Sequence, residues 1–108
     1  MAFGLETEQW EQIRRVLLNS DRIEVALLFG SRAKGNFKPY SDIDLALEGN
    51  NLTLQDVLEL HLALDELELP YKFDLVILNR IEKAALKEHI ARVGIPVFNR
   101  LKQENSAA

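Results

Sequence analysis

The sequence contains no cysteine, which excludes disulfide bonds, zinc–thiolate sites and a thiol nucleophile. It also lacks any apolar run near the roughly 20 residues that a membrane-spanning helix needs. The first six residues have neither the basic stretch nor the apolar core of a signal peptide. We therefore expect a cytoplasmic protein with no membrane partner.

An excess of positive charge is missing as well. Thirteen Lys and Arg residues against 17 Asp and Glu residues give a net charge of −4. Proteins that bind long nucleic acids usually carry a basic surface, and no aromatic platform or recognition helix stands out here, so we expect no long nucleic-acid partner. The short basic stretch of Arg32, Lys34 and Lys38 is suited to a single polyphosphate instead.

A chain of 108 residues, 47% of them hydrophobic, is suited to one domain with a buried core. Helical spacing and capping residues predict helices over residues 8–19, 53–67 and 81–93, with caps at Thr7, Thr53 and Gly94. Apolar runs predict strands over residues 23–29, 42–47, 72–78 and 95–98. The polar segment 32–41 indicates a short helical turn followed by a loop.

This order of elements predicts an α/β or α+β domain in which helices pack on one small mixed β-sheet. We place the domain at residues 1–98 and a polar C-terminal tail at residues 99–108. The leucines of segment 53–67 cover an arc of roughly 220°, which is wider than a surface helix needs. We interpret this arc as ordinary core, with a partner-docking surface as the alternative.

A glycine–serine pair follows the first predicted strand. A helix start offers unpaired backbone N–H groups and a positive dipole end. Gly30 allows the backbone to come close to a ligand, and the Ser31 hydroxyl can donate to a phosphate oxygen. The pair is therefore a candidate phosphate site, with Arg32 beside it as a further candidate ligand.

Three aspartates form the second candidate feature. Asp42 and Asp44 are two residues apart on a predicted strand, so their carboxylates point to the same face. Two such charges raise each other's pKa, and a divalent cation relieves the repulsion. Asp74 lies on the next strand and reaches the same cluster if the two strands are neighbours. Oxygen ligands of this kind, completed by phosphate and water, are suited to Mg²⁺.

These residues carry a resemblance to a known family. Its motif has two parts separated by ten residues, namely Phe29-Gly30-Ser31 and Asp42-Ile43-Asp44-Leu45. The motif resembles the signature of the DNA-polymerase-beta-like nucleotidyltransferase superfamily, and the longer segment GSRAKGNFKPYSDIDLAL resembles its minimal members, the MNT proteins. The resemblance covers the chain from about Ile23 to Phe98.

The resemblance implies a function and a set of roles. Gly30 and Ser31 would hold the triphosphate, Asp42 and Asp44 would bind metal, and Asp74 would assist the acceptor hydroxyl. The reaction would transfer a nucleoside monophosphate, with AMP from ATP as the expected group, and release pyrophosphate. MNT proteins are often paired with a helical HEPN-type protein as the antitoxin of a toxin–antitoxin module.

The larger enzymes of this superfamily add a second domain that holds the acceptor. We therefore expect a partner protein, or a homo-oligomer, to complete the site of this chain. The main alternative is a non-catalytic binding module of the same fold that neutralises its partner by complex formation. His61 and His89 lie on predicted helices, and we interpret both as surface or partly packed residues because the mechanism needs no histidine.

Overall fold

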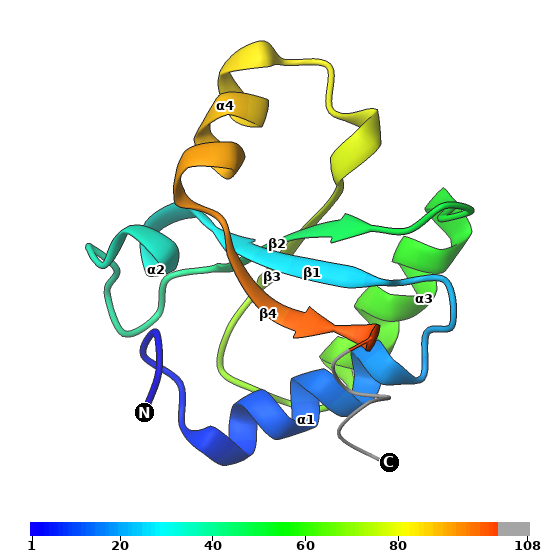
Figure 1. Ribbon diagram of the computed structural model, residues 1–108. Coiled ribbons are helices and arrows are strands. Elements are labelled where there is room, and N and C mark those ends of the chain that lie inside the picture. Colours follow the sequence, from blue (N-terminus) through cyan, green and yellow to red (C-terminus); the bar gives the residue numbers. More distant parts are fainter. Residues whose placement is uncertain (102–108) are drawn as a thin grey trace.

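The structure is a computed structural model and describes residues 1–101. Within this range the elements follow one another as α1 (Thr7–Leu18), β1 (Val25–Phe29), α2 (Gly30–Lys34), β2 (Ile43–Glu48), α3 (Leu54–Asp65), β3 (Phe73–Ile77), η1 (Leu78–Arg80), α4 (Ala84–Val93) and β4 (Ile95–Asn99). Figure 1 shows the sheet between two layers of helices. No helix of the described residues is long and apolar enough to span a membrane.

The four strands form one mixed sheet in the order β3-β2-β1-β4. Strand β1 is antiparallel to both β2 and β4, whereas β2 and β3 are parallel. The predicted small mixed sheet is therefore confirmed. Because β1 and β2 are antiparallel, the end of β1 and the start of β2 lie at the same end of the sheet. The start of β3 lies there too.

The main core lies between the sheet and the two helices α1 and α3, which pack on the same face (Figure 1). Helix α1 buries Trp10, Ile13 and Leu17 in this core. A smaller cluster on the opposite face packs α4 against the sheet, with Phe29 and Ile90 at its centre. The sheet is thus covered on both faces, as an apolar run such as residues 25–29 requires.

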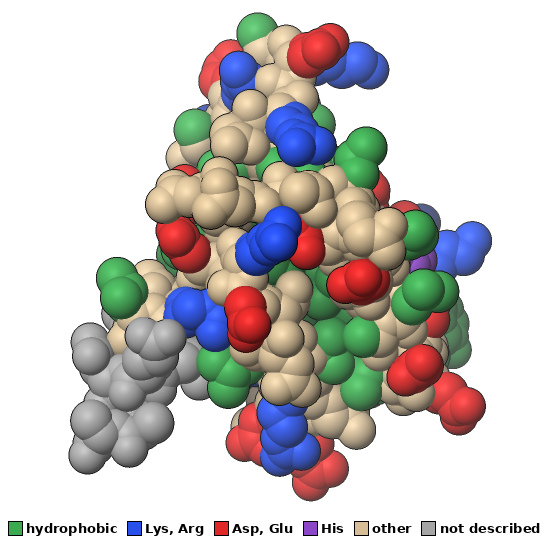
Figure 2. Space-filling model, turned by 90° about the vertical axis from the view of Figure 1, so that its right-hand side faces the viewer, with side chains coloured by type: hydrophobic (Ala, Val, Ile, Leu, Met, Phe, Trp, Pro, Cys, Tyr) green, Lys and Arg blue, Asp and Glu red, His purple; other side chains and the backbone are tan. Residues whose placement is uncertain are grey.

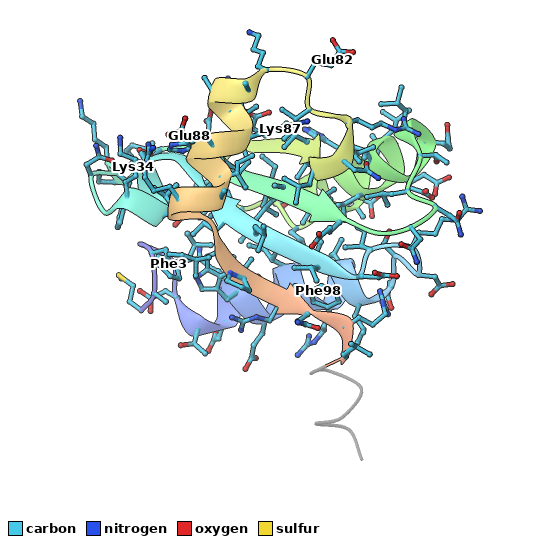
Figure 3. The ribbon with its side chains drawn as sticks, turned by 45° about the horizontal axis from the view of Figure 1, so that its top comes forward. Phe3, Lys34, Glu82, Lys87, Glu88 and Phe98 are labelled. Atoms are coloured by element: carbon cyan, nitrogen blue, oxygen red, sulfur yellow. The ribbon has the colours of Figure 1, made fainter. Side chains whose placement is uncertain are left out.

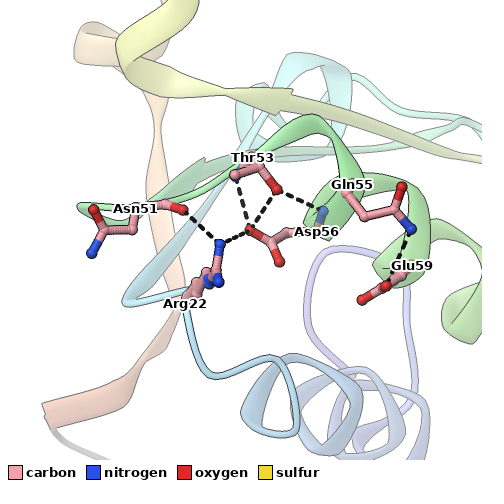
Figure 4. Close-up of polar contacts among 6 residues, drawn as sticks. All are labelled: Arg22, Asn51, Thr53, Gln55, Asp56 and Glu59. Atoms are coloured by element: carbon pink, nitrogen blue, oxygen red, sulfur yellow. Dashed lines mark hydrogen bonds and ion pairs between the residues drawn. The ribbon is translucent and has the colours of Figure 1, made fainter.

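Helices α1 and α3 both begin with a capping box, but of the two predicted N-terminal caps, Thr7 and Thr53, the first is wrong. Helix α1 starts one residue early, because Glu6 and Gln9 form the reciprocal pair and Thr7 is already helical. Helix α3 has the predicted cap at Thr53, which forms a capping box with Asp56 (Figure 4). The backbone N–H of Thr53 lowers the pKa of Asp56.

Near the C-terminal end, the predicted start of the third long helix needs correction, whereas its predicted cap at Gly94 is confirmed. Helix α4 begins at Ala84, because η1 and an extended stretch take up the residues before it. Gly94 follows α4, but its φ of −60° is not left-handed. Glycine fits there because a side chain would collide with the Ile90 carbonyl oxygen.

The predicted tail contains part of the sheet. Asn99 is the last residue of β4 and pairs with Val25, so the sheet extends one residue past the predicted boundary at residue 98. The guanidinium of Arg100 then donates to the carbonyl oxygens of Ser20 and Ile23, both at 2.9 Å. The rest of the predicted tail, residues 102–108, lies outside the described residues.

The leucine arc of α3 divides into a buried and an exposed part. Leu60 and Leu64 are buried in the main core. By contrast Leu54, Leu58 and Leu62 are 72%, 56% and 57% exposed. Their spacing of four residues places them along one side of the helix. The interpretation of the whole arc as core is therefore wrong for this exposed stripe.

Candidate active site

Gly30 connects the glycine–serine turn directly to the acidic cluster. Its φ of +74° is a conformation that residues with a side chain rarely adopt. A Cβ at this position would also collide with the Asp44 carboxylate. The register of the sheet explains this approach, because Phe29 pairs with Asp44 where β1 ends. Two independent constraints therefore require glycine here.

The carboxylates of Asp44 and Asp74 lie side by side on neighbouring parallel strands. The two residues are direct register partners, and Asp42 immediately precedes β2. Burial, followed by the negative charges of Asp74 and Asp42 and a hydrogen bond to Asp74, raises the pKa of Asp44 to about 6. Asp44 is half-buried, whereas Asp42 and Asp74 are exposed. The structure thus brings the three predicted aspartates into one electrostatic site.

The donor set is suited to a divalent cation that shares its ligands with a substrate. All three side chains offer carboxylate oxygens, the ligands that Mg²⁺ prefers. Within residues 1–101 no group of three acidic or histidine side chains is placed so that it could hold a metal ion. Mg²⁺ is usually held by one or two carboxylates and by substrate phosphates rather than by protein alone. The residues present therefore fit Mg²⁺ together with a nucleotide.

Arg32 does not point to the place where a phosphate would bind. Its side chain is 1% exposed, and its guanidinium donates to the carbonyl oxygens of Ser41 at 2.7 Å and Phe3 at 2.8 Å. It also lies 5.2 Å and 4.8 Å from the ring centres of Phe37 and Tyr71. These contacts do not support the predicted role as a phosphate ligand.

Arg32 instead fixes the loop that leads into the acidic cluster. Ser41, which accepts two of its hydrogen bonds, directly precedes Asp42. Burial lowers the pKa of Arg32, while the charges of Tyr71, Asp44 and Asp42 oppose that shift. Its positive charge in turn lowers the pKa of Asp44, against the larger effects that raise it. Arg32 is therefore a buried cation that stabilises the loop leading into the acidic cluster.

His89 is a site residue that the sequence did not reveal. Its Nε2 accepts a hydrogen bond from the backbone N–H of Gly30 at 3.2 Å, and its ring packs edge-on against Phe29. The side chain is half-buried between α4 and the turn. Figure 3 shows α4 next to α2, with Glu88 labelled on α4 and Lys34 on α2. The Nε2 atom of the other histidine, His61, instead lies 3.2 Å from the carbonyl oxygen of Phe73.

The sequence matches the polymerase beta nucleotidyltransferase family over residues 11–103. This match covers most of the chain and includes the glycine–serine turn and all three aspartates. The chain therefore belongs to the polymerase beta nucleotidyltransferase family. Among curated proteins no match was found.

Several solved structures share the fold. A toxin–antitoxin structure with AMP-PNP aligns with a TM-score of 0.69 and 22% identity, covering 89% of this chain and 77% of the other. The structure of tri-AMPylated Shewanella oneidensis HEPN toxin with MNT antitoxin gives a TM-score of 0.66 and 19% identity, with coverages of 94% and 78%. The structure of the MntA–HepT toxin–antitoxin aligns with a TM-score of 0.64 and 20% identity, covering 93% of this chain and 78% of the other. At these identities the likeness establishes the fold.

Proposed function

We propose that this protein transfers AMP from ATP, with Mg²⁺ as cofactor, to a hydroxyl group on a HEPN-type toxin and so acts as its antitoxin. The observation that carries the proposal is the contact of Gly30 with Asp44, which in turn lies beside Asp74. A turn built for a phosphate chain and a repelling set of carboxylates thus share one end of the sheet. Nucleotidyl transfer needs both parts in one place.

Each part of the site has a chemical task. Gly30 and Ser31 hold the triphosphate, and the close packing of Gly30 on Asp44 brings that chain next to the acidic residues. Asp42, Asp44 and Asp74 would hold Mg²⁺, which when bound stabilises negative charge on phosphate and lowers the pKa of a hydroxyl group. Asp74 is exposed at the edge strand, where an acceptor can approach.

The overall step is a substitution at the α-phosphorus of ATP. The acceptor oxygen forms a bond to that phosphorus, and the bond to the β-phosphate breaks. Pyrophosphate carries the electron pair away, and the acceptor loses its proton to the surrounding carboxylates or water. Because the reaction consumes ATP, it supports the cytoplasmic location expected from the sequence.

The exposed stripe of α3, Leu54, Leu58 and Leu62, supports a protein partner. Three leucines more than half exposed on one side of a helix form a large apolar surface. Residues 51–71 carry acidic side chains but no Lys or Arg, so two copies of this surface would repel each other. Figure 2 shows hydrophobic and acidic side chains interspersed on this side of the molecule. The surface is suited to a partner with an apolar patch and a basic rim.

Similar structures support the same partner. One of them describes a HEPN toxin that is AMPylated while bound to its MNT antitoxin, and another a toxin–antitoxin with a nucleotide analogue.

The proposal is tested by incubating the protein with ATP labelled at the α-phosphate, Mg²⁺ and a HEPN-type partner protein. We expect label on the partner, and at least a hundredfold less with Asp42→Asn or Asp44→Asn. Absence of transfer, or equal transfer by the variants, contradicts the proposal. If the variants still neutralise the toxin in cells, the alternative of a non-catalytic binding module is correct.

A further inference from the structure

We propose that His89 is a positioning residue that holds the nucleotide-binding turn in its productive conformation. This inference rests on the proposed function, because it concerns how Gly30 and Ser31 receive the triphosphate. The observation is the hydrogen bond from the Gly30 N–H to His89 Nε2, which joins α4 to a turn 59 residues earlier in the chain.

The hydrogen bond defines the state of the imidazole. A backbone N–H can only donate, so Nε2 must present a lone pair and the ring proton must lie on Nδ1. The His89 ring is then oriented, and it makes a T-shaped contact with Phe29, at 6.1 Å between ring centres and 80° between planes. The same side chain therefore contacts two successive residues at the end of β1.

The turn needs such an anchor because glycine has little conformational preference of its own. Without a side chain, Gly30 reaches its φ of +74° and many other conformations at similar cost. The contact with Asp44 limits the space on one side of Gly30 but does not orient the peptide group between Phe29 and Gly30. His89 fixes the direction of that peptide group, and the following residue, Ser31, is oriented with it.

The first experiment needs no nucleotide. Amide hydrogen exchange at Gly30, measured by NMR on the metal-free protein, reports its hydrogen bond directly. We expect His89→Leu, which keeps an apolar contact with Phe29 but has no acceptor, to exchange at least tenfold faster at Gly30. His89→Gln, which has an acceptor oxygen at a similar reach, should restore most of the protection. Unchanged exchange in His89→Leu overturns the inference.

The second experiment measures binding and turnover separately. We expect His89→Leu to raise the Kd and KM for Mg²⁺-ATP about five- to tenfold, the worth of one hydrogen bond, with a smaller change in kcat. His89→Gln should recover at least half of the loss, and His61→Leu serves as a control outside the turn. A purely structural role would lower the melting temperature in both His89 variants and leave the KM unchanged.

The outcomes separate this inference from the proposed function. If the unmodified protein does not bind Mg²⁺-ATP, the proposed function fails, and the positioning role fails with it. If it binds Mg²⁺-ATP and His89→Leu binds equally well, only the role of His89 is overturned. Faster exchange at Gly30 together with weaker nucleotide binding, both reversed by His89→Gln, is the result that the inference predicts.

Discussion

Asp44 shows at the scale of a single residue how the site differs from an ordinary strand face. Burial and two neighbouring carboxylates raise the pKa of Asp44 to about 6. Above that pH the metal-free protein carries a negative charge on Asp44, and this charge lowers its stability. A residue of this kind is typical of functional sites. The fold tolerates it because the rest of β2 is buried in apolar contacts.

The raised pKa gives a prediction about stability and pH. The folded chain retains a proton on Asp44 that the unfolded chain releases between the two pKa values, 3.8 and about 6, so this residue's contribution to stability falls as the pH rises through that window. At pH 7 we expect Asp44→Asn to raise the melting temperature by on the order of 2–4 °C, a modest value because water screens a half-buried group.

The measurement is thermal unfolding of the metal-free protein from pH 4 to pH 7. The difference between Asp44→Asn and the unmodified protein should grow with pH, while Asp21→Asn, a change at an exposed position, should show no such trend. A variant that is less stable than the unmodified protein at pH 7 contradicts this account of Asp44.

Two glycines with similar backbone conformations allow a matched comparison. Gly30 and Gly35 both have positive φ, at 74° and 89°, but only Gly30 has an atom in the way of a side chain. We expect Gly35→Ala to cost about 1 kcal/mol of unfolding free energy, and Gly30→Ala to cost at least about 2 kcal/mol, because the collision with Asp44 adds to the backbone strain.

Denaturant unfolding measures these costs, and a nucleotide-transfer assay measures the effect on function. Gly30→Ala should lose most of the activity and Gly35→Ala should keep it. Equal effects of the two substitutions would mean that the contact between Gly30 and Asp44 has no special role.

The same residues show what could be predicted from the sequence. Gly30, Asp42, Asp44 and Asp74 were identified because their residue types and spacing carry a local signal, and the structure brings them together. The buried position of Arg32 could not be predicted, because its hydrogen-bond partner Phe3 and its ring contact Tyr71 lie far away in the sequence. His89 was missed for the same reason, since its partner is 59 residues distant.

At the scale of elements, the order of helices and strands was predicted correctly, whereas several ends were not. The predicted start of the last helix at residue 81 is three residues early, because η1 ends at Arg80 and an extended stretch separates it from Ala84. The parallel pairing of β2 with β3 could only be assumed from the sequence, because two strands separated by a helix need not be neighbours. The structure places them side by side.

The exposed stripe of α3 is the element-scale feature with the clearest functional consequence. Sequence periodicity gave the width of the apolar arc but not the part that the sheet covers. We expect Leu58→Asp to weaken the complex with the HEPN-type partner by about ten- to a hundredfold, because it places an unpaired charge in an apolar contact. Leu58 is already 56% exposed, so the fold should be unaffected.

The binding constant of the complex, measured by calorimetry, checks this prediction. Leu18→Asp is the control, because Leu18 is an exposed leucine on α1 rather than α3. If both substitutions weaken binding equally, the partner does not recognise the stripe of α3.

At the scale of the whole molecule, the site and the main core occupy different places. The core lies between the sheet and helices α1 and α3, whereas the site lies at the end of the sheet where β1 ends and β2 and β3 begin. This separation explains how the chain can hold a glycine with positive φ and a set of carboxylates that repel one another. It also predicts that neutralising the aspartates leaves the fold intact.

The most direct test of one shared metal and nucleotide site uses Mn²⁺ in place of Mg²⁺. Added with a non-hydrolysable ATP analogue, this paramagnetic ion broadens the NMR signals of nearby amides. We predict selective broadening at Gly30, Ser31, Asp44 and Asp74, and its loss in Asp44→Asn, with the signals of α3 unchanged. Broadening centred elsewhere, or undiminished in Asp44→Asn, would show that these residues do not form one site.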